Sequence, residues 1–248
     1  MTEVLKAHDV AVSFGGIQAV RGVTLSLEKG SLIGLIGPNG AGKTTFLRIL
    51  TGIVRPNRGS IHLGGVDVTR SPVDKRARSG LAITHQIVRP FRHLSVLENV
   101  AIAAGHKLTI SPLIAILNCD RRKQEAKSLS LLKLVGLEAV ASLPAGNLPL
   151  GQLKRLEVAR ALALDPTILL LDEPLAGLNQ SEATALSDII ASLNRDGLTI
   201  MLVEHRLAEV MRICQRLAVL DQGTLLAEGS PQEVMTRSDV RAAYMGGP

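Results

Sequence analysis

A glycine-rich segment followed by a lysine and two threonines is the clearest chemical signal in this 248-residue sequence. It fits the pattern GxxxxGK followed by Ser or Thr, and it consists of Gly37, Pro38, Asn39, Gly40, Ala41, Gly42, Lys43, Thr44 and Thr45. Glycines let successive backbone N–H groups point at one anion, and a following helix adds the positive end of its dipole. We expect Lys43 to reach the β- and γ-phosphates of a nucleotide and the Thr44 hydroxyl to bind Mg²⁺. A glycine turn beside a solvated lysine is the alternative.

Two adjacent carboxylates end an apolar run later in the chain. Asp172 and Glu173 follow residues 168–171, which read as a buried strand. Ligands bind at the carboxyl ends of parallel strands, and successive strand residues face opposite ways. We therefore expect Asp172 to hold Mg²⁺ through water and Glu173 to orient and polarise an attacking water. A pair that only caps a helix is the alternative.

Apolar runs predict the elements that position these residues. Residues 32–36 read as a buried strand before the glycine-rich segment, and residues 42–50 read as the helix after it. Residues 167–171 and 198–203 are further buried-strand runs. Because these runs alternate with helices, they predict a parallel α/β core.

Other patterns predict an antiparallel part and a helical part. Short strands are expected at residues 10–14 and 23–27, and a hairpin at 60–68. Residues 95–143 change to helical character, opening with a capping box and including an irregular helical stripe over 121–135.

Further features follow in a fixed order around these two signals. Phe14 precedes the glycine-rich segment, Gln86 and residues 148–152 lie before the acidic pair, and residues 175–179 lie after it. His205 follows the last predicted buried strand. Taken singly, Phe14 could be a core residue, Gln86 a solvated loop residue and His205 an ordinary polar residue. All of them in one order make the sequence resemble the ATP-binding cassette (ABC) ATPase family over essentially its whole length.

The resemblance implies a nucleotide site for ATP with Mg²⁺. Phe14 would stack on adenine, and Val20 would belong to the same nucleotide-binding set. Gln86 corresponds to the Q-loop glutamine, whose amide oxygen would complete the Mg²⁺ shell with Thr44 and Asp172.

The resemblance also implies catalytic roles and a second chain. His205 corresponds to the switch histidine, which would act in catalysis with Glu173 and Lys43. Residues 175–179 correspond to the D-loop. The signature segment, which would act on the ATP of a partner chain, is Leu148, Pro149, Leu150, Gly151 and Gln152.

The sequence departs from the family pattern at three positions. Pro149 stands where the signature has Ser or Ala, so it offers neither a hydroxyl nor an N–H. Leu150 stands where Gly or Tyr is common. Arg206 follows His205, where Asp is common. Gly151 and Gln152 still match.

The fold implied by the resemblance is α/β, with a P-loop NTPase core of ABC type and a mixed sheet. Residues 1–248 would form one ABC ATPase domain with an N-terminal antiparallel β subdomain. Residues 1–90 and 161–248 would form the catalytic core, and about 91–160 the helical signature subdomain. Within the latter, residues 108–117 are apolar and are expected either to dock a membrane partner or to be ordinary core.

Several segments resemble the ATPase subunits that serve uptake of branched-chain and other hydrophobic amino acids, and the long insertion resembles the larger of the two such subunits. These segments are residues 14–20, 156–162, 173–179, 203–205 and 227–234, with the insertion at 99–146. The implied partners are membrane permease subunits, a second ATPase subunit in a homo- or heterodimer and, indirectly, a periplasmic binding protein. The implied location is the cytoplasmic face of the inner membrane, as a peripheral subunit. The alternatives are a soluble ABC ATPase of the iron–sulfur assembly type, or the ATPase of a urea or lipopolysaccharide transporter.

Composition excludes several other classes of protein. The net charge of +6 suits a phosphate-rich ligand or an anionic membrane surface, although a solvated face is the commoner reason. Four aromatic residues and no Trp are too few for a single-stranded nucleic-acid binder that works by stacking, so no nucleic-acid partner is expected. Cys119 and Cys214 lack CxxC spacing and predict no metal site. The longest apolar run, residues 108–117, is too short to span a bilayer.

Overall fold

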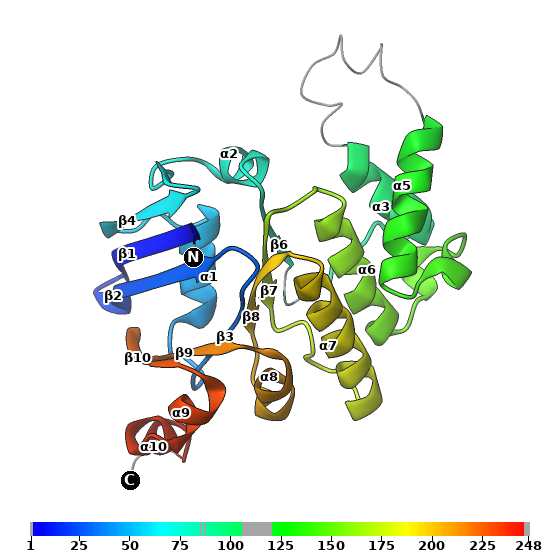
Figure 1. The fold of residues 1–248 in the computed structure, drawn as a ribbon. Coiled ribbons are helices and arrows are strands. Elements are labelled where there is room, and N and C mark those ends of the chain that lie inside the picture. Colours follow the sequence, from blue (N-terminus) through cyan, green and yellow to red (C-terminus); the bar gives the residue numbers. More distant parts are fainter. Residues whose placement is uncertain (1, 85, 87, 106–120, 246–248) are drawn as a thin grey trace.

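The computed structural model describes residues 2–84, 86, 88–105 and 121–245 (Figure 1). Its larger sheet has six strands in the order β10-β9-β3-β8-β7-β6. The strands are β3 (Leu32–Ile36), β6 (Leu81–Thr84), β7 (Ile168–Asp172), β8 (Thr199–Val203), β9 (Arg216–Asp221) and β10 (Thr224–Gly229). All neighbours pair in parallel except β10, which pairs antiparallel with β9. The predicted mixed sheet is therefore confirmed. Strands β3, β7 and β8 are buried throughout, as expected where both faces of a parallel sheet are covered.

The smaller sheet is antiparallel and has the order β2-β1-β4-β5. Its strands are β1 (Glu3–Phe14), β2 (Ile17–Glu28), β4 (Arg58–Leu63) and β5 (Val66–Asp67). The hairpin predicted at 60–68 is present, but β1 and β2 are longer than the short strands predicted. Register shifts on both sides of Val10, next to Asp9 with its φ of 48°, break the alternation of apolar residues. The apolar alternation in the sequence therefore does not show that β1 is one long strand.

Helix α1 (Lys43–Thr51) lies between the two sheets (Figure 1). Its buried Phe46 and Leu50 join one hydrophobic cluster with residues of both sheets. Ile168 and Leu170 of β7 point into this cluster, whereas Leu169 and Leu171 point into the cluster on the opposite face. Because strand side chains alternate, Asp172 at the end of β7 lies on the α1 side of the sheet.

Helices cover the opposite face of the large sheet. A helical group stands at the side away from the antiparallel sheet and contains α3 (Val96–Ala104), α5 (Arg121–Leu134), η2 (Glu138–Val140), η3 (Ala145–Asn147) and α6 (Leu150–Leu162) (Figure 1). The predicted capping box is present at the start of α3, where Ser95 and Glu98 bond reciprocally. Helix α6 packs against both α3 and β6, so it joins this group to the core. The apolar run at 108–117 lies outside the described residues.

The remaining helices connect or follow the strands and lie outside the helical group. They are α2 (Val73–Arg78), α7 (Gln180–Arg195), α8 (Leu207–Ile213), α9 (Pro231–Thr236) and α10 (Ser238–Met245). In the part of the chain that the structure describes, every helix is too short or too polar to cross a bilayer.

Candidate functional site

The glycine-rich segment joins β3 to α1, which is the strand–loop–helix setting that its pattern requires. Two of its glycines are fixed by close approach of other backbone. A Cβ at Gly37, whose φ is 149°, would lie 2.0 Å from the carbonyl oxygen of Leu220. A Cβ at Gly42, whose φ is 97°, would lie 2.4 Å from the carbonyl oxygen of Ala19. The loop therefore curls as a phosphate-binding loop does, and side chains at these two positions would prevent it.

Lys43 is the cation of this loop and is only 5% exposed. Its Nζ donates to the carbonyl oxygens of Gly37, at 2.7 Å, and Pro38, at 2.9 Å. Burial lowers the pKa of the Lys43 ammonium, while the charges of Glu173 and Asp172 act to raise it. The ammonium is thus held at the floor of the loop by neutral acceptors, which a phosphate oxygen can replace.

A cavity of about 200 Å³, called the phosphate cavity below, lies over this loop. It is lined by Ala19, the loop and first-turn residues 39–45, and two residues distant in sequence, Glu173 and His205. The structure therefore brings the predicted phosphate loop, the predicted catalytic carboxylate and His205 to one cavity. Phe14 is 50% exposed at the end of β1 and does not line it.

The structure corrects one predicted nucleotide contact. Val20 is fully buried in the hydrophobic cluster between the sheets, so its side chain has no surface to offer a nucleotide. The alternation of β2 turns Val20 inward. The neighbouring Ala19 lines the cavity instead.

The carboxylate of Glu173 lies between the side chains of Gln86, which follows β6, and His205, which follows β8. Its Oε1 is 2.9 Å from Nε2 of His205, and its Oε2 accepts a hydrogen bond of 2.6 Å from Nε2 of Gln86. Glu173 also has a φ of 48°, in the left-handed region, and its N–H donates to the carbonyl oxygen of Val203 at 2.9 Å. This backbone turns the carboxylate from the line of β7 toward the cavity, and such strain is common at functional sites.

The three predicted Mg²⁺ ligands line a second cavity of about 480 Å³. Thr44, Gln86 and Asp172 lie there, with Glu157 and Arg160 from α6 among the other lining residues. A hydroxyl, an amide oxygen and one carboxylate suit a Mg²⁺ ion that takes its other ligands from phosphates and water. The amide nitrogen of Gln86 faces Glu173, which leaves the amide oxygen as the acceptor. Among the described residues no three His, Cys, Asp or Glu side chains gather as a metal site.

The signature segment does not reach the chain's own phosphate cavity, since none of its residues line it. Helix α6 begins at Leu150, with Pro149 at the N-cap and no side-chain capping bond. A Cβ at Gly177 would lie 2.9 Å from Cδ2 of Leu150, so Leu150 packs over the D-loop. The N–H groups of the first turn of α6, which include those of Gly151 and Gln152, have no intrahelical acceptors, and such a helix start can accept an anion.

Sequence reasoning gave no role to three residues next to this site. The buried Glu204 accepts hydrogen bonds from the N–H groups of Leu175, at 2.6 Å, and His205, at 3.1 Å. Burial raises the pKa of the Glu204 carboxyl, and these hydrogen bonds act against the rise. Arg206 donates to the carbonyl oxygen of Leu178, which ties the residue after His205 to the D-loop. A third, Lys154, has an available signal: it is a lysine within the otherwise apolar buried stripe of α6.

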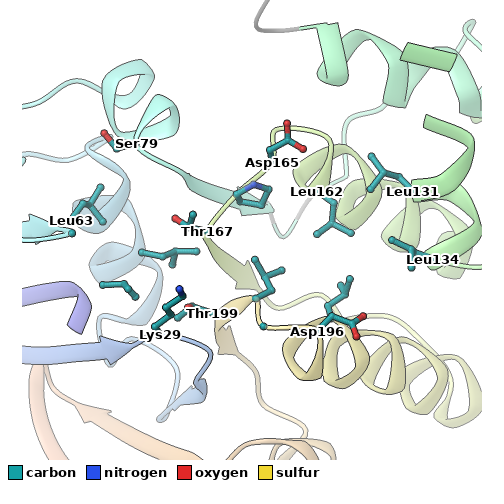
Figure 2. A pocket seen from close by; sticks show the side chains of 17 residues that line it. Lys29, Leu63, Ser79, Leu131, Leu134, Leu162, Asp165, Thr167, Asp196 and Thr199 are labelled. Carbon is teal, nitrogen blue, oxygen red and sulfur yellow. The ribbon is translucent and has the colours of Figure 1, made fainter. Parts of the chain in front are cut away.

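A further hollow of about 660 Å³ opens at the opposite edge of the sheet (Figure 2). It lies among Leu63 of the small sheet, Leu131 and Leu134 of α5, and the starts of β7 and β8 at Thr167 and Thr199. Ligands of parallel sheets bind at the carboxyl ends of the strands. This hollow is at their amino ends, so it is separate from the phosphate cavity.

Comparison with known proteins decides the family. The family model described as ABC transporter matches residues 20–176. The chain belongs to the ABC transporter family. As a member it is an ATP-binding and ATP-hydrolysing cassette.

Full-length relatives and solved ABC cassettes are similar throughout. The branched-chain amino acid transport ATP-binding protein LivG of Escherichia coli strain K12 is 40% identical over 98% of both chains, and BraF of Pseudomonas aeruginosa is 38% identical over the same shares. The lipopolysaccharide export ATP-binding protein LptB of Acidithiobacillus ferridurans is 36% identical over 99% of this chain and 98% of its own. An ATP-binding cassette of an ABC transporter, solved in its ADP conformation, is 29% identical with a TM-score of 0.88, covering 99% of this ABC cassette and 100% of the other.

Proposed function

We propose that this cassette is the ATP-hydrolysing subunit of an importer for branched-chain or other hydrophobic amino acids. Its similarity to LivG and BraF extends over nearly the full length of each chain and supports this substrate class. The observation that carries the enzymatic part is the carboxylate of Glu173, which faces the phosphate cavity between Gln86 and His205.

Each residue around the cavity has a proposed role in ATP hydrolysis. The loop amides and the Lys43 ammonium bind the phosphates, and Phe14 on the exposed end of β1 stacks on the base. Thr44, Gln86 and Asp172 hold Mg²⁺, which neutralises charge on the phosphates when it is bound.

Glu173 and His205 act on the reacting atoms in this proposal. Glu173 accepts a proton from the attacking water and orients it, because its carboxylate lines the same cavity as the phosphate loop. His205 lies on the same cavity and stabilises charge on the terminal phosphate. Gln86 and His205 each contact one of the two carboxylate oxygens of Glu173, which orients the base at the cavity.

A second ATPase chain completes the site in this proposal. Leu148, Pro149, Leu150, Gly151 and Gln152 lie away from the chain's own cavity, which suits a segment that closes on the ATP of a partner. A solved bacterial ABC transporter cassette that is 25% identical to this chain has a dimeric structure, which supports such a pair. Two chains arranged head to tail would enclose two ATP molecules. Because ATP contacts both chains, it stabilises the closed dimer. Hydrolysis removes this stabilisation, so the dimer can open.

The proposed partners and location follow from membrane transport. Permease subunits bind the ATPase pair, and a periplasmic binding protein delivers the amino acid to them. The cassette is a peripheral subunit at the cytoplasmic face of the inner membrane. Residues 1–90 and 161–248 act as the catalytic core, and about 91–160 form the helical signature subdomain.

The similarity to LptB makes lipopolysaccharide export the second candidate. The test is to express the chain together with permease subunits and the second ATPase from the same genome, purify the complex from membranes, and reconstitute it in lipid vesicles supplied with the periplasmic binding protein. ATP-dependent accumulation of radiolabelled leucine by the wild type, abolished by Glu173→Gln, is the expected result. Transport of lipopolysaccharide or urea but not of leucine would reject the amino acid assignment, and recovery of the chain without any membrane partner would reject transport.

A further inference from the structure

Lys154 is a buried lysine on α6, one helical turn after Leu150, the first residue of the helix. It is only 5% exposed, and its neighbours along the same stripe of the helix, Gly151 and Val158, are also buried. An ammonium group is costly to bury unless hydrogen-bond acceptors surround it. The position of Lys154 therefore requires specific partners.

Those partners are the backbones of two site residues. The Nζ of Lys154 donates to the carbonyl oxygen of Gln86 at 2.7 Å and to the carbonyl oxygen of Glu173 at 3.3 Å. The side chains of Gln86 and Glu173 are themselves joined by a hydrogen bond of 2.6 Å. Lys154, Gln86 and Glu173 thus form a closed ring of contacts between α6, the segment after β6 and the end of β7.

The backbone that Lys154 holds is the strained part of the site. Glu173 has a left-handed φ of 48°, which costs free energy and persists only where surrounding contacts fix it. Burial lowers the pKa of the Lys154 ammonium, and the charges of Glu204 and Glu173 are the main influences that raise it. Hydrogen bonds from a charged donor are roughly twice as strong as neutral ones, so this contact is well suited to hold the turn.

We propose that Lys154 is a positioning residue that joins the signature end of α6 to the backbone of Gln86 and Glu173. This inference rests on the proposed function, in which the first turn of α6 contacts the ATP of a second chain. One turn of helix, about 5.4 Å along its axis, separates that contact from Lys154. Movement of α6 when the partner's ATP binds is therefore passed to the chain's own catalytic carboxylate, and the two ATP sites are coupled through this side chain.

The decisive variant is Lys154→Met, which keeps the length of the side chain and removes the donor. Lys154→Arg keeps a charged donor, and Lys154→Gln is a shorter neutral replacement for use if the Met variant does not fold. The matched control is Lys127→Met on α5. The Nζ of Lys127 also bonds a backbone carbonyl, that of Ala163 at 3.3 Å, and pairs with Asp165 at 2.6 Å beside the hollow of Figure 2.

We expect Lys154→Met to lower the kcat of ATP hydrolysis by the full chain about tenfold or more, with KM changed less than about twofold. Lys154→Arg should restore most of kcat, and Lys127→Met should leave both constants near wild type. An unchanged kcat in Lys154→Met and Lys154→Gln, or equal losses in Lys154→Met and Lys127→Met, would overturn the inference.

Backbone hydrogen exchange separates this inference from the proposed function. The peptide that contains Glu173 and Leu175 should exchange faster in Lys154→Met than in the wild type or in Lys127→Met. If the wild-type chain does not hydrolyse ATP, the proposed function is contradicted. A difference in exchange would still show that Lys154 holds the backbone of Glu173. Equal exchange in all three proteins would reject the positioning role of Lys154 even if the wild type hydrolyses ATP.

Discussion

The Nε2 atom of His205 lies 2.9 Å from the Oε1 atom of Glu173. This contact follows from the register of two parallel strands, because Asp172 at the end of β7 pairs with Val203 at the end of β8. Glu173 and His205 lie just beyond those paired ends, where neighbouring strands bring their following residues to one edge of the sheet. The same contact places both side chains on the phosphate cavity.

Glu173→Gln should trap the ATP-bound dimer. The amide keeps the shape of the side chain but cannot accept the proton of water, so ATP binds and is not cleaved. In gel filtration the variant should elute as a dimer with ATP and Mg²⁺ and at smaller size without nucleotide. Adding Lys43→Ala should abolish the dimer, and a dimer that persists without nucleotide would contradict the role of ATP in closing it.

Lys43→Ala should weaken ATP binding. The variant loses a charged donor that is held 2.7 Å and 2.9 Å from the carbonyls of its own loop, ready to transfer to phosphate. A charged hydrogen bond contributes about 1.5–3 kcal/mol, so the dissociation constant should rise about tenfold or more. Binding of a fluorescent ATP analogue measures this. The exposed Lys29, replaced by Ala, is the control, and equal affinity of Lys43→Ala and Lys29→Ala would reject the assignment.

The two ATP sites should be unequal if the second ATPase is a different chain with an intact signature. Pro149 offers neither a hydroxyl nor an N–H to the partner's ATP, and it leaves the start of α6 without a side-chain cap. Turnover at the partner's phosphate loop should therefore be about tenfold or more slower than at this chain's loop. The measurement is single-site turnover after the catalytic glutamate of each chain is replaced in turn.

Replacing Pro149 by Ser and Leu150 by Gly in the same assembly should raise turnover at the slower site. The hydroxyl restores a hydrogen-bond donor for phosphate, and the smaller residue opens the face that Leu150 now covers beside Gly177. Equal turnover at the two sites, or no gain from these substitutions, would contradict the predicted inequality.

Glu204→Gln should change how stability depends on pH. Because burial raises the pKa of Glu204 above its ordinary value of 4.5, the folded chain keeps this proton to a higher pH than the unfolded chain does. The resulting stabilisation is present below pH 4.5 and is lost as pH rises through the raised pKa. The free energy of unfolding of the variant relative to wild type should therefore increase from acid to neutral pH. Denaturant unfolding at several pH values measures both free energies. If the variant-minus-wild-type difference stays constant or falls with pH, burial does not raise the pKa of Glu204.

The local parts of this site could be predicted from sequence because neighbouring residues build them. The phosphate loop needs only β3, its glycines and α1, and the acidic pair needs only the end of β7. The extent of β1 could not be predicted, since the register shifts around Val10 interrupt the apolar alternation on which strand prediction depends.

The contacts that Lys154 and Glu204 make between distant segments were beyond sequence reasoning. Lys154 and Gln86 are 68 residues apart, and Glu204 and Leu175 are 29 apart, so only the strand order brings them together. The inward turn of Val20 depends likewise on how β2 packs over α1. A buried lysine in an apolar stripe signals that a partner exists but does not say which one.

Release of phosphate from ATP by the purified full chain tests the central claim most directly. With Mg²⁺ present the wild type should turn over ATP. Glu173→Gln should bind ATP with similar affinity but hydrolyse it at least about a hundredfold more slowly, because it lacks the general base. Hydrolysis by Glu173→Gln at the wild-type rate would contradict the assignment of Glu173 as the catalytic carboxylate of this cassette.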